Sequence, residues 1–183
     1  MCEEVMIRHS SPTLAGMKTG CLVTYRFQDE LEMRQCVSSW NRVIVTKGLR
    51  ALPLRYRNGT ALLYIYRVSS LVRDLQQSDA QEILLAKGYS CNHAQSCIGK
   101  LRSKLNQQAE FPHEIGLFLG YPPEDVRGFM ENHASGYKHV GYWKVYGDKG
   151  AAERWFSRYK KCTSVYRTQY ARGITIERLT VAG

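Results

Sequence analysis

Residues 52–67, LPLRYRNGTALLYIYR, decide the fold of this chain. Leucine and tyrosine alternate with proline and arginine up to Arg57, and Asn58-Gly59 then supplies the pair best suited to a tight hairpin turn. The nearly continuous apolar run Thr60–Arg67 predicts a partner strand deep in a sheet. Pro53 lacks an N–H donor, so the first arm is expected at the sheet edge. Because a hairpin pairs its strands in opposite directions, a purely parallel sheet is excluded.

The segments around the hairpin alternate between the two-residue period of strands and the 3.6-residue period of helices. Asp29 with Glu32, and later Asp148, supply side chains that open helices. The expected elements, in chain order, are a strand at 21–27, a helix at 29–48, the hairpin, helices at 70–77, 78–87 and 93–107, a buried strand at 115–119, a helix at 123–132, a strand at 140–146, a long helix at 148–173 and a strand at 174–179.

This order of elements predicts an α/β or α+β fold. We expect a single layered domain over residues 1–183, in which helices flank a β-sheet of mixed strand direction. The Asn-Gly hairpin supplies antiparallel pairing, and the strand–helix–strand run near the C-terminus allows parallel pairing. Residues 1–20 are expected to form an N-terminal arm, a loop that packs on this domain.

The chain is strongly basic, with 26 Lys and Arg residues against 16 Asp and Glu residues and a net charge of +10. Such a field favours anionic partners, which include nucleic acid, an acidic protein surface and a small molecule bearing phosphate or carboxylate. The cations are densest at 100–104 and 154–161. Basicity alone does not choose among these partners.

The sequence contains no membrane or export signal that we can identify. No apolar run approaches the roughly 20 residues that a transmembrane helix needs, and the N-terminal MCEEVMIRH lacks the basic start and apolar core of a signal peptide. We therefore expect a cytoplasmic protein without membrane contact. The six cysteines follow no pairing rhythm, so most are expected to be free thiols that act as small apolar residues.

Polar groups gather in the N-terminal segment RHSSPTLAGMKTG, which Pro and Gly punctuate. A loop that leads into a sheet can place hydroxyls and a lysine over a pocket, although an ordered arm is an equal alternative. His113 becomes a candidate because imidazole changes charge near neutral pH, although most single histidines are structural. The predicted site contains His9 and His113 as proton-transfer groups, Lys18 and Lys144 as cations, Thr13 as a ligand contact and Trp143 as a stacking surface.

Three other motifs give weaker signals. The GYPPED turn at 120–125 has the strand-to-helix form of phosphate sites, but its prolines remove N–H donors and its acids repel phosphate, so we interpret it as a helix cap. The spacing of Gly16 and Lys18 does not fit a nucleotide-binding P-loop. Cys91, His93 and Cys97 are potential metal ligands, but a closed site needs a fourth ligand, so no metal site is predicted.

Several motifs resemble an uncharacterised "domain of unknown function" family of anaerobic Firmicutes. They are HSSPTLAGMKTG, LLYIYR, FPHEIGLFLGYPPEDVRGF, GYWKVYGD and AAERWFSRYKKCTSVY, which together cover most of the chain. The family has no established activity. Its pattern often has His-Cys where this chain has His9-Ser10, which argues against a thiol mechanism at that position. The resemblance implies a role beside flavodoxin-like and iron-handling proteins, and hence in anaerobic redox or metal metabolism.

The leading hypothesis is therefore a cytoplasmic protein that binds an anionic small molecule, with its transformation as a further hypothesis. A nucleic-acid-binding module that uses the basic face at 154–161 is the main alternative. A metal or haem carrier, and an adaptor for an acidic flavodoxin-like partner, are the remaining alternatives. The sequence identifies no cofactor.

Overall fold

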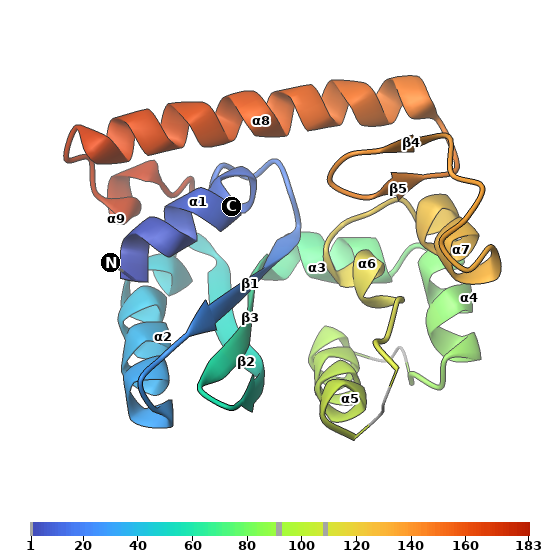
Figure 1. Cartoon of the computed structure of the whole chain (residues 1–183), viewed down its shortest axis with the longest axis horizontal. Coiled ribbons are helices and arrows are strands. Elements are labelled where there is room, and N and C mark those ends of the chain that lie inside the picture. The colour runs from blue at the N-terminus through green and yellow to red at the C-terminus, as the bar shows by residue number, and fades with distance from the viewer. Residues whose placement is uncertain (1, 91–92, 108–109) are drawn as a thin grey trace. The chain divides into compact units, whose positions relative to one another are not determined.

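The computed structural model describes residues 2–90, 93–107 and 110–183 (Figure 1). The chain forms two compact units: Met1–Ser70 with Tyr159–Gly183 make the first, and Leu71–Arg158 make the second. The combination of helices with a β-sheet confirms the predicted fold class. Among the described residues, no helix combines the length and the apolar character that crossing a membrane requires.

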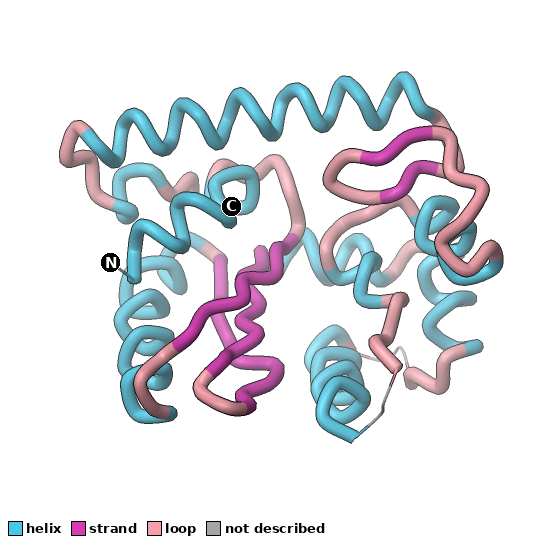
Figure 2. The backbone as a smooth tube through the Cα atoms, in the orientation of Figure 1, coloured by secondary structure: helices cyan, strands magenta, loops and turns pink. Residues whose placement is uncertain are grey.

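The first unit contains a three-stranded sheet. Its strands β1 (Gly20–Arg26), β2 (Leu49–Arg57) and β3 (Thr60–Arg67) lie in the order β1–β3–β2, drawn in magenta in Figure 2. Asn58 and Gly59 have φ angles of 50° and 75°, which confirms the predicted hairpin turn. Both outer strands run antiparallel to β3, so the sheet is antiparallel rather than mixed. The central place of β3 explains its continuous apolar sequence.

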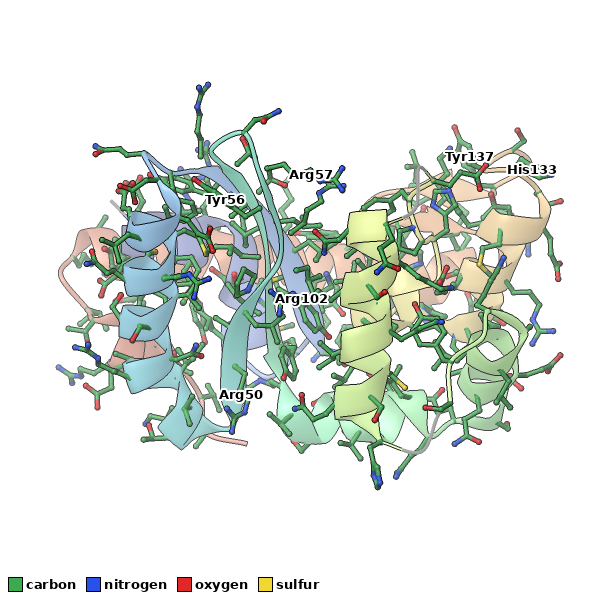
Figure 3. All side chains as sticks on the ribbon, turned by 90° about the horizontal axis from the view of Figure 1, so that it is seen from below. Arg50, Tyr56, Arg57, Arg102, His133 and Tyr137 are labelled. Atoms are coloured by element: carbon green, nitrogen blue, oxygen red, sulfur yellow. The ribbon has the colours of Figure 1, made fainter. Side chains whose placement is uncertain are left out.

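Strand β2 lies at the sheet edge, as Pro53 predicted, and carries features that discourage pairing with another chain. Its register against β3 shifts between Pro53 and Arg55, as in a β-bulge. Arg50 and Arg57 are exposed and stand toward the two ends of the strand (Figure 3). Proline, a bulge and exposed charges are the usual means by which proteins protect sheet edges from aggregation.

Helices α1 (Cys2–Leu14) and α2 (Glu30–Ile44) pack on the sheet, and α9 (Ile176–Leu179) packs against these two helices. A 3₁₀ turn (Val45–Lys47) follows α2. The predicted capping box of α2 is confirmed. The Asp29 carboxylate accepts a hydrogen bond from the Glu32 N–H at 2.7 Å, and the Glu32 carboxylate accepts one from the Gln28 N–H at 2.7 Å. The core between helices and sheet includes Met6, Ile7, Leu14, Val23, Met33, Trp40, Ile44, Leu63 and Ile65.

The second unit is largely helical. Its elements are α4 (Ser78–Ala86), α5 (Ala94–Gln107), α6 (Ile115–Phe118), α7 (Pro123–Glu131) and a small hairpin of β4 (His139–Val140) and β5 (Lys144–Val145). Helices α3 (Val68–Leu75) and α8 (Lys149–Ala171) each belong partly to both units. The predicted helices at 70–77, 78–87, 93–107, 123–132 and 148–173 are thus confirmed within a few residues.

One buried carboxylate fixes the hairpin of the second unit on α7. The Asp125 side chain is 3% exposed and accepts hydrogen bonds from Trp143 Nε1 at 2.6 Å, the Tyr146 N–H at 2.7 Å and the Gly147 N–H at 2.8 Å. Asp125 also lies in the first turn of α7, where the helix dipole favours a negative charge. Asp125 is therefore structural, but it fixes the hairpin, and no side chain of the GYPPED turn caps α7 by a hydrogen bond.

Two predicted strands are wrong because short apolar runs do not distinguish strand from buried helix. Residues 115–119 form the buried turn of α6, which Gly120 ends with φ of 74°. Residues 174–179 form α9, where the Thr175 hydroxyl accepts a hydrogen bond from the Arg178 N–H at 3.4 Å. The predicted strand at 140–146 is instead a hairpin, because the chain reverses at 141–143.

The predicted N-terminal loop is also wrong, since α1 runs through it to Leu14. Its serines and threonine suggested a loop, but they face inward, and the Ser11 hydroxyl donates to the Ile7 carbonyl one turn earlier. The expected free thiols are confirmed for Cys21, Cys97 and Cys162, whereas Cys36 is disulfide-bonded.

Replacing Asp125 tests the account of the second unit. Asp125→Ala leaves three donors without their acceptor, so we expect the free energy of unfolding to fall by about 3 kcal/mol in urea denaturation. The exposed Glu131 on the same helix provides the control. Glu131→Ala should change the free energy of unfolding by less than about 0.5 kcal/mol. Equal effects of the two substitutions would contradict the structural role of Asp125.

Candidate functional site

Four side chains gather where α1 ends and β1 begins, and we call Ser10, Thr13, Lys18 and Cys21 the junction cluster. Ser10 and Thr13 are 0% exposed and Cys21 is 5% exposed, whereas Lys18 is partly exposed. Ser10 and Thr13 share a face of α1 because they are three residues apart. Cys21 alternates in step with the core residue Val23, so both point to the face that α1 covers.

The end of α1 is held by a buried arginine from β3. The Arg67 guanidinium donates hydrogen bonds to the carbonyls of Thr13 at 2.7 Å, Leu14 at 2.6 Å and Val181 at 2.8 Å. Carbonyls in the last turn of a helix have no partner within the helix. Arg67 therefore satisfies these acceptors and fixes the position of Thr13 in the junction cluster.

The loop after α1 positions Lys18. The N–H groups of Met17 and Lys18 both donate to the Pro12 carbonyl, at 2.9 and 3.1 Å, and Gly16 allows this wrap with φ of 77°. Tyr159 of α8 donates its hydroxyl to the Met17 carbonyl at 3.3 Å. Several backbone contacts thus place the lysine beside the first residues of β1.

The amine and the thiol of the cluster influence each other. Burial raises the pKa of the Cys21 thiol, while the Lys18 ammonium and the Ser10 and Thr13 hydroxyls act to lower it. Burial lowers the pKa of the Lys18 ammonium, and the nearby Cys21 raises it by a smaller amount. The Cys21 thiol also donates weakly to the Ile65 carbonyl at 3.8 Å. The environment therefore disfavours charge on both groups.

The two hydroxyls of the cluster lack adequate hydrogen bonds. Ser10 and Thr13 lie near enough to the Cys21 sulfur to stabilise its thiolate, yet neither hydroxyl makes a hydrogen bond of normal geometry within the described part of the chain. Because sulfur is a weak acceptor, we regard both hydroxyls as unsatisfied. A buried unsatisfied hydroxyl costs roughly 1–3 kcal/mol, so this arrangement requires an explanation.

Together, the cluster offers two hydroxyl donors and an amine beside a weakly polar thiol. Such donors suit an oxyanion such as phosphate or carboxylate. A metal ion does not fit equally well, because three or more His, Cys, Asp or Glu side chains never gather closely enough in the described residues. Of the Cys91, His93 and Cys97 set, Cys91 lies outside the described residues.

The structure brings two of the six predicted site residues together, since Thr13 and Lys18 both belong to the junction cluster. His9 is on α1 in the same unit, with its side chain exposed. Local desolvation and the adjacent Arg8 lower the pKa of His9, which favours the neutral imidazole at neutral pH. His113, Trp143 and Lys144 belong to the second unit. A pocket shared by all six stays a prediction.

The three residues of the second unit make local contacts. The Trp143 ring stacks on Tyr121 at 4.8 Å between centroids and meets the edge of Phe156 at 4.5 Å. Lys144 Nζ donates to the Ala134 carbonyl at 2.8 Å and lies 4.7 Å from the Tyr137 ring centroid. His113 and Lys144 both contact the ring of Phe129, so these two are neighbours.

A second buried polar group, which the sequence did not indicate, lies beside His113. Glu114 accepts hydrogen bonds from Lys104 Nζ at 2.6 Å and from the Tyr89 hydroxyl at 3.0 Å. Burial first, and then the Glu114 carboxylate, raise the pKa of Tyr89. His113 is exposed, whereas Glu114 is 3% exposed. Every member of this group is satisfied, which suits a structural role.

The six predicted site residues did not include Ser10 and Cys21 of the junction cluster, nor Arg67, which holds the end of α1. Alternation along β1 could have identified Cys21, because it shares the phase of Val23. The position of Arg67 at the end of the continuous apolar run of β3 could have identified it, because a buried cation needs several acceptors.

In a comparison with protein families, residues 6–180 match a family described as "Protein of unknown function (DUF3793)". This confirms the predicted membership of a family of unknown function, whereas its restriction to anaerobic Firmicutes stays a prediction. No curated protein and no solved structure matches the chain.

The lowered pKa of Lys18 predicts a pH dependence of stability. Because the unfolded chain binds this proton more tightly than the folded protein, wild-type stability rises with pH through the window between the folded pKa and the ordinary value of 10.5. Lys18→Met removes this contribution. Its free energy of unfolding should therefore fall relative to wild type as the pH is raised from neutral to 10.5 in urea denaturation.

The exposed Lys87 provides the control for this measurement. Lys87→Met should follow the wild-type pH profile, because an exposed ammonium is hydrated in both states. A constant difference between Lys18→Met and wild type at all pH values would contradict the assignment.

Proposed function

The chain belongs to the DUF3793 family of proteins of unknown function, and we propose that it binds a small anionic molecule at the junction cluster. The observation that carries this proposal is the pair of fully buried hydroxyls, on Ser10 and Thr13, that lack adequate hydrogen bonds beside the Lys18 amine and the Cys21 thiol. An oxyanion in this position would accept from both hydroxyls and from the ammonium.

Charge supports an anion in preference to a neutral ligand. The net charge of +10 raises the local concentration of anions around the molecule. Burial opposes the charged form of Lys18, and a bound anion supplies the opposite charge that restores it. Binding is therefore coupled to protonation of Lys18.

The cluster favours binding over nucleophilic catalysis by its cysteine. A thiolate is the reactive form of cysteine, and the raised pKa of Cys21 keeps the thiol protonated at neutral pH. Cys21 then contributes a small, weakly polar wall. The family resemblance likewise argued against a thiol mechanism at His9-Ser10.

The wider site extends the proposal on sequence grounds. His9 and His113 are proposed as proton-transfer groups, and Trp143 and Lys144 as further ligand contacts. A cytoplasmic location, a flavodoxin-like partner and a role in anaerobic redox or metal metabolism rest on the family resemblance, and they also stay predictions.

Thr13→Val separates binding from folding. Valine has nearly the same shape as threonine but no hydroxyl, so the variant should be as stable as wild type, or more stable, in chloride buffer. Inorganic phosphate at about 100 times its Kd should raise the free energy of unfolding of wild type by about 2.7 kcal/mol. The variant should lose most of this increase, as measured by urea denaturation with phosphate or with chloride at equal ionic strength.

Thr24→Val on the exposed face of β1 provides the matched control and should retain the phosphate effect. Phosphate also stabilises any protein in general, because it is excluded from protein surfaces. Both variants experience this general effect, so comparing them isolates the effect of binding. Equal phosphate responses of Thr13→Val and Thr24→Val would overturn the proposal.

A further inference from the structure

Helix α8 carries a row of cations on its outward face. Arg154, Arg158 and Lys161 are all exposed and lie at positions i, i+4 and i+7, which fall on one face of a helix. The buried residues Ala152, Phe156 and Tyr159 lie on the opposite face. We call the three cations the α8 stripe. Its geometry follows from the regular helix alone and extends about 10 Å along the axis.

Beyond Glu153, which directly precedes Arg154, no acid follows along α8 to balance the charges of the α8 stripe. Residues 154–172 contain six Lys and Arg residues and no Asp or Glu. None of the ion pairs in the described part of the chain includes a member of the stripe. Like charges three or four residues apart repel and destabilise a helix. The chain therefore maintains an unfavourable arrangement on this surface.

The helix dipole does not explain the stripe. Positive charge is favoured within the last turn of a helix, and the last turn of α8, which ends at Ala171, holds no basic residue. The stripe lies nearer the middle of the helix, beyond the reach of that effect. Arg158 is moreover held against a ring, with its Cζ 4.6 Å from the Trp155 ring centroid, which orients the guanidinium while leaving its donors available.

We propose that the α8 stripe binds the phosphate backbone of a nucleic acid. Arginine donates in pairs to phosphate oxygens, and successive members of the stripe are about 6 Å and about 4.5 Å apart along the axis. The exposed Ser157 and Ser164 flank the stripe and add hydroxyl donors, which often contact phosphate. This function is separate from anion binding at the junction cluster.

A nucleic acid fits this surface better than a membrane or an acidic protein. An interfacial membrane helix needs a broad apolar face that is exposed, whereas the apolar face of α8 is buried. The centres of protein interfaces are depleted of charged residues, whereas the stripe presents three cations in a row. The Trp143 ring, which was predicted as a stacking surface, packs on Tyr121 and Phe156. We therefore expect backbone contacts with little sequence preference.

Fluorescence anisotropy with labelled duplexes and single strands of about 20 nucleotides tests this proposal. Three phosphate contacts predict a slope of about −2.7 in log K against log[KCl] for duplex DNA. The affinity should therefore fall about 40-fold when the KCl concentration is raised from about 50 mM to about 200 mM. The triple variant Arg154→Gln/Arg158→Gln/Lys161→Gln should lose at least about tenfold in affinity and most of the slope. Its fold is checked by circular dichroism and urea denaturation, which should show stability equal to wild type or higher.

Arg42→Gln/Lys87→Gln/Lys100→Gln provides the matched control, because it removes the same three charges from the net +10 at exposed positions elsewhere. This control should keep nearly all of the affinity. Absence of binding at low salt, or equal losses in both triple variants, would overturn the proposal. Equal competition by polyglutamate, or by phosphatidylserine vesicles, would also overturn it in favour of a protein or membrane partner.

Discussion

The buried Arg67 guanidinium is the interaction on which the first unit depends. It joins the end of β3 to the last turn of α1, 53 positions away, and to Val181, 114 positions away. Helix-end carbonyls lack partners and carry the negative end of the helix dipole, so they match a cation that stays charged when buried. Without this cation, α1 would lose the contacts that hold Ser10 and Thr13 against Cys21.

Unsatisfied buried polar atoms of the described residues occur in the junction cluster and also at Trp40 Nε1 and the Tyr146 hydroxyl. Asp125 and Glu114 are both buried, and each has its donors in place, so they lock local geometry. Ser10 and Thr13 are buried without adequate partners, although most buried polar groups in folded proteins have them. A protein tolerates such a penalty most readily where a ligand supplies the missing acceptor.

The sequence predicted features that have a local cause. Asn58-Gly59 and Asp29 with Glu32 specify a turn and a cap through their own side chains and backbone, and both are present. Residues 115–119 and 174–179 contain only short apolar runs, which fit a strand or a helix equally well. Both segments form helices, because tertiary packing determines their conformation. Thr13 and Lys18 were identified by composition, whereas Cys21 and Arg67 matter through contacts made across the fold. The antiparallel pairing of β1 with β3 was likewise set by contacts that no local motif encodes.

A crystal structure of the protein grown in phosphate at neutral pH would test the central claim most directly. We expect density for a tetrahedral anion within about 2.6–3.2 Å of the Ser10 and Thr13 hydroxyl oxygens and of Lys18 Nζ, with Arg67 still bound to the end of α1. A junction that is closed by hydrogen bonds from both hydroxyls to protein carbonyls, with no space for an ion, would contradict it.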